Sequence, residues 1–307
     1  MTLKKPRVSI GLPIYNAERY LRGALDGILN QTYHDFELII CDNASTDSTP
    51  EICRQYAAKD PRIRYYRNHV NLGVSRNFNR AFELSTGEYF KWCAHDDLLA
   101  TDYIEKCVKV LDENPDVVLC YSKARSVNEH GEEMRYYTYT LRTDSPRASE
   151  RFHDLALYEH PCFQNFALIR AEALRKTPLH EHYAWSDRVF LARLGLLGRF
   201  YRIPEYLHTD RDHTETSVNR FKNLHNVTRK YFNPHWPEDK LIFPAWMQLR
   251  GYLRAIMAYP MPLAERLACL RVMLTWVKRY RPKLVRDVRL ALQPLKPLYA
   301  RLLLRRS

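Results

Sequence analysis

The chain has 307 residues, of which 46% are hydrophobic and 27% charged, with a net charge of +13 when the histidines are neutral. This composition supports a sizeable hydrophobic core and excludes a largely disordered chain. The seven scattered cysteines contain no Cys-x-x-Cys pair, so we expect neither a zinc site nor a disulfide framework, and a reducing cytosol fits best.

The two ends of the sequence carry different signals. No apolar run is long enough to cross a bilayer, and the short apolar stretch 8–14, broken by Pro13, predicts a first strand rather than a signal peptide. Residues 219–307 contain 19 Lys and Arg against 4 Asp and Glu, whereas residues 1–218 contain 29 against 31. We therefore expect a nearly neutral domain over residues 1–218 and a basic region over residues 219–307.

Strand and helix patterns alternate through the first region. Apolar runs predict strands at residues 8–12, 36–41, 63–67, 88–93 and 117–121. Helical spacing of apolar residues predicts helices at residues 18–30, 49–58, 75–84 and 101–113. This alternation is typical of a doubly wound α/β sheet, in which ligands bind beyond the carboxyl ends of the strands.

The remaining elements are predicted in the same way. Residues 134–140 and 166–170 have strand patterns, and residues 188–196 have a helical one. In the basic region, helical spacing occurs at residues 219–233, 241–257, 263–278 and 283–304. Basic amphipathic helices either lie on an anionic membrane surface or cap the preceding domain with their charge toward solvent, and both interpretations stay open here.

Two adjacent carboxylates, Asp96 and Asp97, follow the strand at residues 88–93. Neighbouring carboxylates repel each other, and a divalent cation relieves that repulsion. Mg²⁺ usually takes one or two protein carboxylates and completes its shell with water and substrate phosphate. The pair therefore predicts a metal–diphosphate site, with a loop that caps the helix near Thr101 as the alternative.

Other polar residues lie where neighbouring strands end. Pro13, Tyr15 and Asn16 follow the first strand, and residues 42–47 follow the second. The turn at residues 71–77 opens a helix and offers backbone N–H groups and Arg76 to an anion. Residues 42–47 could instead form Asx-turns and helix caps, and Arg76 could lie on a solvated helix face.

In this order and spacing, these motifs resemble glycosyltransferase family 2, whose members are inverting sugar-nucleotide transferases. The resemblance covers about two-thirds of the chain and rests on residues 8–16, 31–32, 36–47, 71–77 and 87–97. It implies a GT-A fold, which is a Rossmann-like α/β fold, followed here by a mainly helical, basic C-terminal extension. It also implies a nucleoside-diphosphate sugar as donor, and Mg²⁺ or Mn²⁺ as cofactor.

The resemblance also implies roles at the donor site. Asp42 would hydrogen-bond the pyrimidine edge, while Pro13 and Tyr15, next to Asn16, would pack on the base. Asp96 would lie near the ribose, and Asp97 would hold the metal on the diphosphate.

The chain departs from the family pattern at two of these motifs. Ala44 follows Asp42-Asn43 where the family often has glycine, and residues 93 and 94 lack the first acid of an Asp-x-Asp-Asp motif. The second departure leaves fewer carboxylates for the metal.

Two further residues match family positions in the second half of the domain. An acceptor hydroxyl must lose a proton, and the family uses an Asp before a helix as the base, which corresponds to Asp187. The alternative is that Ser186 or Asp187 only caps that helix. His213 lies in a segment that resembles one near the diphosphate or metal, although a His in a polar loop is often simply solvated.

The implied function is transfer of a sugar to a hydroxyl of a polysaccharide, a lipid-linked oligosaccharide or another cell-envelope acceptor. We expect a cytoplasmic enzyme that can contact the inner face of an anionic membrane. A nucleic-acid-binding protein is one alternative, suggested by a pI of about 9.4, but the basic charge is confined to the C-terminal region. A nucleotidyltransferase is another, but residues 11–16 lack the usual Gly-rich, basic phosphate loop.

Overall fold

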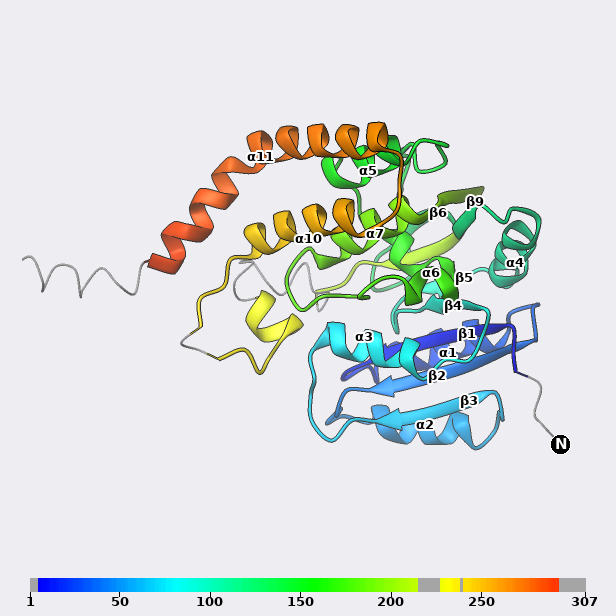
Figure 1. Cartoon of the computed structure of the whole chain (residues 1–307). Helices are drawn as coiled ribbons and strands as arrows, with labels where there is room; N and C mark the ends of the chain where they lie inside the picture. The colour runs from blue at the N-terminus through cyan, green and yellow to red at the C-terminus, as the bar shows by residue number, and fades with distance from the viewer. Residues whose placement is uncertain (1–4, 215–226, 238–239, 293–307) are drawn as a thin grey trace, which may run out of the picture.

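The computed structural model describes residues 5–214, 227–237 and 240–292 (Figure 1). The strands are β1 (Val8–Ile14), β2 (Phe36–Asp42), β3 (Ile63–Arg67), β4 (Tyr89–Trp92), β5 (Leu98–Leu99), β6 (Val117–Val127), β7 (Glu133–Tyr136), β8 (Leu168–Arg170) and β9 (Arg199–Arg211). The α-helices are α1 (Leu21–Leu29), α2 (Thr49–Ala57), α3 (Val74–Glu83), α4 (Tyr103–Glu113), α5 (Ala148–Leu157), α6 (Ala171–Arg175), α7 (Ser186–Leu197), α10 (Pro244–Ala258) and α11 (Leu263–Leu292). A 3-10 helix, η1 (Phe163–Phe166), and a π-helix, η2 (Val227–Phe232), complete the described elements.

All nine strands belong to one mixed sheet, in the order β3-β2-β1-β4-β8-β6-β9-β5 with β7 paired to β6. β1 to β4 run parallel to one another, whereas β8 runs antiparallel to both β4 and β6. Parallel strands present their carboxyl ends at the same edge. The loops after β1, β2 and β4 therefore meet at one edge of the sheet, as the sequence predicts.

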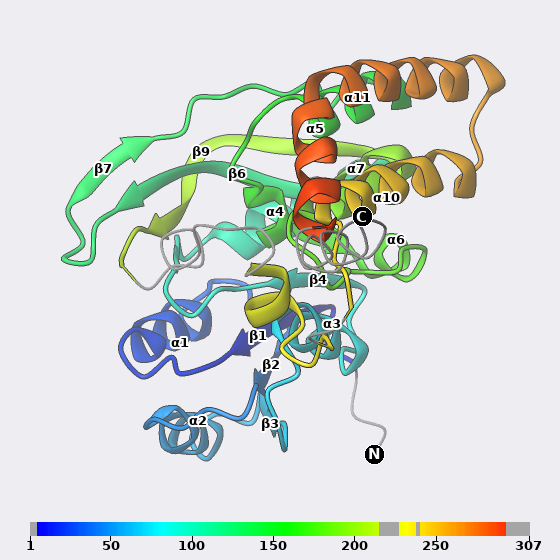
Figure 2. The same ribbon diagram turned by 90° about the vertical axis from the view of Figure 1, so that its left-hand side faces the viewer.

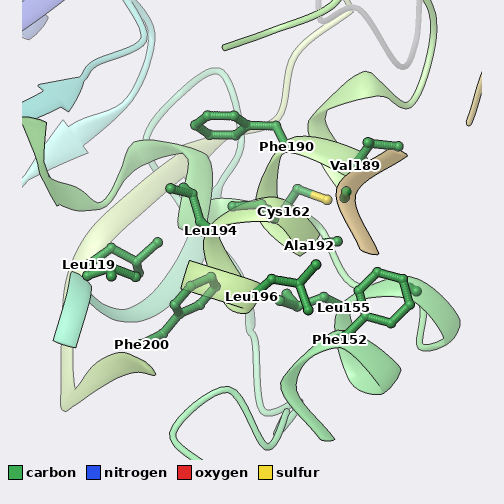
Figure 3. Packing of buried hydrophobic residues seen from close by; sticks show 14 of the residues in the cluster. Leu119, Phe152, Leu155, Cys162, Val189, Phe190, Ala192, Leu194, Leu196 and Phe200 are labelled. Atoms are coloured by element: carbon green, nitrogen blue, oxygen red, sulfur yellow. The ribbon is translucent and has the colours of Figure 1, made fainter. Parts of the chain in front are cut away.

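The sheet is covered on both faces because alternate strand residues point to opposite sides. Leu38 and Ile40 belong to the core shared with α1, α2 and α4. Ile39 and Cys41 belong to the opposite core, which includes residues of α3, α5 and α7. Figure 3 shows this second core, in which Phe152 and Phe190 pack among aliphatic side chains.

The C-terminal helices form a cap on the second core. α10 packs on α7, and α11 packs on α5 and α10 (Figure 1). Tyr252 of α10 and Trp276 of α11 are buried in the same cluster as Phe152 and Phe190. One side of α10 and α11 therefore packs on the preceding domain, as the interpretation of these basic helices as a cap requires.

The structure changes several predicted boundaries in the C-terminal region. The helix expected at residues 241–257 is present as α10. The helices expected at 263–278 and 283–304 are a single helix, α11, with Pro282 inside it. Proline removes a helical hydrogen bond, which accounts for the bend of α11 in Figure 2. The boundary at residue 218, and residues 219–226 and 293–304 of the predicted helices, lie outside the described residues.

Several strands differ from the sequence prediction: β5 was not predicted, and β6 continues to Val127 instead of ending at residue 121. The half-exposed strand expected at residues 134–140 is the short, fully exposed β7. The long strand β9 was not predicted, because Pro204 interrupts its pattern and argues against a strand. In the structure Pro204 and Glu205 fall in a register shift between Ile203 and Tyr206, so the missing N–H breaks no ladder hydrogen bond. None of the described helices is both long enough and apolar enough to cross a bilayer.

Candidate active site

The loop after β2 is built around Asp42, which is completely buried at the end of the strand. Its Oδ1 accepts a hydrogen bond from the Ser45 N–H at 2.8 Å, and its Oδ2 accepts one from the Tyr65 hydroxyl at 2.8 Å. The Arg67 guanidinium lies 3.3 Å from Oδ2. Asp42 therefore stabilises this loop from the inside, and because its side chain is completely buried, a direct bond to a nucleobase requires the side chains around it to move.

The loop after β1 is fastened to the same loop through Asn16. The Asn16 side-chain oxygen accepts the Thr46 N–H at 2.9 Å, and the Asn16 N–H donates to Ser45 Oγ at 2.9 Å. Asn16 has φ 49°, a left-handed conformation that Asn tolerates better than most residues. Pro13 is buried in β1 opposite Cys41, whereas Tyr15 is 42% exposed at the sheet edge. The exposed Tyr15 ring is therefore available for stacking.

A network of buried asparagines positions the start of α3. Asn68 donates to the side-chain oxygens of both Asn43 and Asn77 at 3.0 Å. Asn77 in turn donates to the Cys41 carbonyl at 2.7 Å, and Asn43 donates to Asn71 at 2.8 Å. Buried amides need such partners, so this network fixes the turn before α3 relative to β2.

Arg76 lies on the exposed side of α3. The pKa of His182 is lowered mainly by burial of its ring and, to a smaller extent, by the positive charge of Arg76. No contact joins Arg76 to the carboxylates within the described part of the chain, so its role as a phosphate ligand stays a prediction.

The loop after β4 brings Asp96 against His213, which is only 7% exposed. His213 Nε2 lies 2.9 Å from Asp96 Oδ2, where an ionised carboxylate accepts and the ring donates. Burial opposes ionisation of Asp96, but this hydrogen bond and the neighbouring histidines lower its pKa below the ordinary value. With Nε2 committed to Asp96, His213 could bind a metal only through Nδ1 or after rearrangement.

Tyr20 joins this pair to the loop after β1, because its ring centroid is 5.0 Å from that of His213.

Asp97 faces β9 instead of capping α4. β5 follows Asp97 directly and pairs with β9, so that Leu99 lies opposite His208. His208 Nε2 is 3.3 Å from Asp97 Oδ2, and the Arg211 N–H donates to Asp97 Oδ1 at 3.4 Å. The alternative in which this loop caps the next helix is therefore not what the structure shows.

Asp210 adds a third carboxylate to this region. Burial and, to a smaller extent, the negative charge of Asp97 together raise its pKa to about 6, against a hydrogen bond from the Tyr137 hydroxyl at 3.2 Å. A cation bound nearby would relieve the repulsion between these carboxylates and lower the pKa of Asp210.

These groups fit a divalent cation, although no three side chains in the described ranges are close enough to hold one alone. His208 Nε2 is buried and makes no hydrogen bond of good geometry with a described residue, although it lies 3.3 Å from Asp97 Oδ2, so this ring nitrogen is a candidate second ligand beside Asp97. Carboxylate oxygen and imidazole nitrogen both suit Mn²⁺. A metal here would take one or two protein ligands and complete its shell with diphosphate and water.

Asp187 lies in the first turn of α7, after Trp185, whose backbone is left-handed with φ 69°. Its Oδ1 accepts the Arg188 N–H at 2.9 Å, and burial raises its pKa although Arg188 and Cys162 oppose this shift. Ser186 does not cap the helix, because its Oγ is buried without a partner among the described residues. A strained backbone and a raised carboxyl pKa are both common at catalytic sites.

The segment η1 connects the metal region with Asp187. The His208 ring packs on Phe163 and Phe166, with centroids 5.4 and 6.0 Å away. Cys162 immediately precedes η1, has φ 60°, and is close enough to Asp187 for each to shift the other's pKa. The structure thus joins Asp97 to Asp187 through side chains of β9 and η1, without a direct contact between the two carboxylates.

Sequence reasoning missed His208, Asp210 and Arg211 of β9. His208 and Asp210 alternate along the strand and therefore share a face, which is a signal that the sequence does contain. It was not visible because Pro204 obscured the strand itself.

Comparison with known proteins gives matches over most of the chain. The model described as Glycosyl transferase family 2 matches residues 9–177. An uncharacterized glycosyltransferase of Methanocaldococcus jannaschii is 32% identical over 254 residues, which are 78% of this chain and 82% of the relative. Three mycobacterial relatives are matched over only 120 residues, which are 35% of their length.

Two solved structures resemble the whole chain. TarS 1–349 of S. aureus, in complex with UDP, has a TM-score of 0.55 at 17% identity, covering 90% of this chain and 91% of that fragment. The mannosyltransferase PcManGT of Pyrobaculum calidifontis, in complex with GDP-Man and Mn²⁺, has a TM-score of 0.55 at 18% identity, covering 96% and 84%. At these identities the likeness concerns the fold, and it confirms the expected GT-A architecture with a helical C-terminal region.

Proposed function

The chain belongs to glycosyltransferase family 2, and we propose that it is an inverting, metal-dependent hexosyltransferase. It moves a sugar from a nucleoside-diphosphate sugar to a hydroxyl of a polysaccharide, a lipid-linked oligosaccharide or another cell-envelope acceptor. The observation that carries this proposal is the meeting of Asp96 and Asp97 with His208 and His213 at the carboxyl edge of the sheet. Residues 1–218 form the catalytic domain in this proposal, and residues 219–307 form its helical extension.

The donor site in this proposal is the edge formed by the loops after β1, β2 and β4. Tyr15 stacks on the base, and Asp42 and Asn16 hold the shape of the base-binding loop. Asp96, kept ionised by His213, accepts hydrogen bonds from the ribose hydroxyls. The complexes of TarS with UDP and of PcManGT with GDP-Man support a nucleotide donor at this edge, without deciding which nucleotide this chain uses.

The metal would be held by Asp97, with His208 or His213 as a candidate second ligand. When bound, Mg²⁺ or Mn²⁺ acts as a Lewis acid and stabilises the charge that develops on the departing diphosphate. Asp97 contributes its carboxylate, and Asp210 adds negative charge that favours a cation at this position.

Asp187 acts on the acceptor side as the general base. Its carboxylate takes the proton of the acceptor hydroxyl while that oxygen attacks the anomeric carbon and the bond to the diphosphate breaks. Attack opposite the leaving group inverts the configuration. Burial raises the pKa of Asp187 and so strengthens it as a base. Trp185, next to it, would contact the acceptor in this proposal.

A donor screen tests the proposal. The protein is melted with UDP-, GDP- and dTDP-sugars, each with and without Mn²⁺, because a ligand that binds only the folded state stabilises it by about 2.7 kcal/mol at 100 times its Kd. We expect one nucleotide class to raise the melting temperature, and more so with Mn²⁺. NMR of the transfer product then gives its anomeric configuration. No response to any nucleotide sugar, or a product with retained configuration, would contradict the proposal.

A further inference from the structure

The outer side of α10 and α11 exposes an unusual amount of apolar surface. Of the 17 exposed large hydrophobic side chains in the described residues, ten lie within residues 240–292. The most exposed are Leu274 at 73%, Leu263 at 71% and Met257 at 61%. Soluble proteins rarely gather such side chains on one surface without a function for them.

These side chains form a continuous stripe. Leu263, Leu267, Leu274 and Val277 recur at helical spacing along one side of α11. Leu249 and Leu253 of α10 lie opposite, and the two helices enclose an open groove of about 410 Å³ lined by seven apolar side chains and Arg271. We call this stripe and groove the outer cap surface.

The fold does not need the outer cap surface for its own core. The opposite side of the same helices buries Tyr252, Ile256 and Trp276 against α5 and α7. Each helix is therefore apolar on two sides, of which only one is covered within the described chain.

The charge around the outer cap surface has one sign. Residues 240–292 contain eleven Lys and Arg but only two acids, Glu265 and Asp287. Both acids are turned inward: Glu265 accepts the Ser149 N–H at 2.7 Å, and the fully buried Asp287 accepts the Ala245 N–H at 2.7 Å. The exposed ionised groups around the stripe are therefore cations, among them Arg250, Arg254, Arg271 and Lys278.

An apolar stripe surrounded by cations indicates which kind of partner binds the outer cap surface. A second copy of the chain would bring arginine against arginine across a symmetric interface. Nucleic acid would satisfy the cations but would offer little to a row of leucines. A bilayer with anionic headgroups satisfies both, because apolar side chains enter the headgroup–acyl boundary while Lys and Arg contact the phosphates.

We infer that the outer cap surface docks the enzyme on an anionic membrane, with Leu267 and Leu274 inserted and Arg250, Arg254 and Arg271 at the headgroups. The inference extends the proposed function by placing the catalytic domain beside lipid-linked acceptors. Docking itself needs neither donor nor acceptor, so a failure of docking and a failure of transfer are separate results.

Vesicle sedimentation of the full chain tests the inference. Vesicles of phosphatidylcholine alone are compared with an equimolar mixture of phosphatidylcholine and phosphatidylglycerol. We expect binding to the mixture, weak binding to phosphatidylcholine, and release by high salt. Leu267→Glu/Leu274→Glu should lower the partition coefficient at least about tenfold, since it removes apolar insertion and adds repelling charge. Arg250→Glu/Arg254→Glu should weaken binding only to the anionic vesicles.

The matched control is Met134→Glu, which places the same charge at an exposed apolar position of β7, away from the cap. It should bind vesicles like the wild type, and all variants should keep the wild-type melting temperature because the replaced side chains are exposed. The inference is overturned if the wild-type protein does not bind anionic vesicles, or if Leu267→Glu/Leu274→Glu binds them as tightly as the wild type. The inference is also overturned if the wild type does not bind vesicles but forms a dimer that Leu267→Glu/Leu274→Glu dissociates. It is overturned as well if the wild type does not bind vesicles but binds duplex DNA, and Leu267→Glu/Leu274→Glu binds that DNA equally well.

Discussion

His213 is hydrogen-bonded to Asp96, with 2.9 Å between Nε2 and Oδ2, and this bond joins the loop after β4 to the segment after β9. The histidine holds the carboxylate in its ionised form at the edge where the donor is expected. The two residues therefore act as one unit, in which the ring sets both the charge and the direction of the acid.

Replacing this ring should weaken donor binding in the presence of metal. Outer partners of metal and substrate ligands typically contribute 10- to 100-fold in affinity, and we expect a loss of about that size for His213→Ala. Titration calorimetry of the matching nucleotide sugar with Mn²⁺ measures it. His130→Ala, at an exposed position, is the control. His213→Gln should recover part of the affinity because its amide nitrogen can reach the position of Nε2 and donate to Asp96, and unchanged affinity in His213→Ala would remove His213 from the site.

Asp210 should make stability depend on pH in a defined direction. Its pKa is about 6 in the folded protein, through burial and the charge of Asp97, against about 3.9 in an unfolded chain. The folded state thus holds the proton more tightly, and this contribution to stability is present below pH 4 and lost as the pH rises through 6. Asp210→Asn should be more stable than wild type at pH 7.5 in EDTA, by up to about 3 kcal/mol, with little difference at pH 4.

Urea unfolding at the two pH values checks this expectation, with Glu113→Gln as an exposed carboxylate control. A stability difference that is the same at both pH values would show that Asp210 does not titrate as described.

Ala44 should carry backbone strain that glycine relieves. Its φ is 65°, in the left-handed region, at the position where the family often has glycine. A left-handed conformation costs a residue with a Cβ about 1–2 kcal/mol, while glycine loses about 0.5–1 kcal/mol of chain entropy on folding. Ala44→Gly should therefore raise the free energy of unfolding by up to about 1 kcal/mol, as measured by denaturant titration. A clear loss of stability would mean that Ala44 is not strained.

Much of the donor edge could be predicted from the sequence because its signals are local. β1 to β4 are short segments rich in aliphatic and aromatic residues, and Asn16, Asp42, Asp96 and Asp97 lie at their ends or within a few residues of them. The pairing of Asp96 with His213 spans 117 residues, and no periodicity encodes a contact of that range. β9 was hidden by Pro204, and with it His208 and Asp210, because the register shift that accommodates the proline exists only in the assembled sheet.

The acceptor side could be predicted less well for a related reason. Asp187 was placed by family resemblance, whereas the left-handed backbones of Trp185 and Cys162 and the burial of the carboxylate arise from the packing of η1 on α7. The outer cap surface shows the same limit. Helical spacing predicts amphipathic helices, but which side meets the core and which remains exposed depends on α5 and α7.

The central claim is that Asp187 removes the acceptor proton in a nucleotide-sugar transfer reaction, and the Asp187→Asn variant tests it most directly. Donor affinity and transfer rate are measured on the same preparation. We expect a folded protein with wild-type donor affinity and a transfer rate reduced by about 10²- to 10⁴-fold. Burial raises the pKa of Asp187. As the pH is lowered, the wild-type transfer rate should therefore begin to fall at a higher pH than it would for a base with an ordinary carboxylate pKa. A folded Asp187→Asn enzyme that transfers sugar at the wild-type rate would contradict this account.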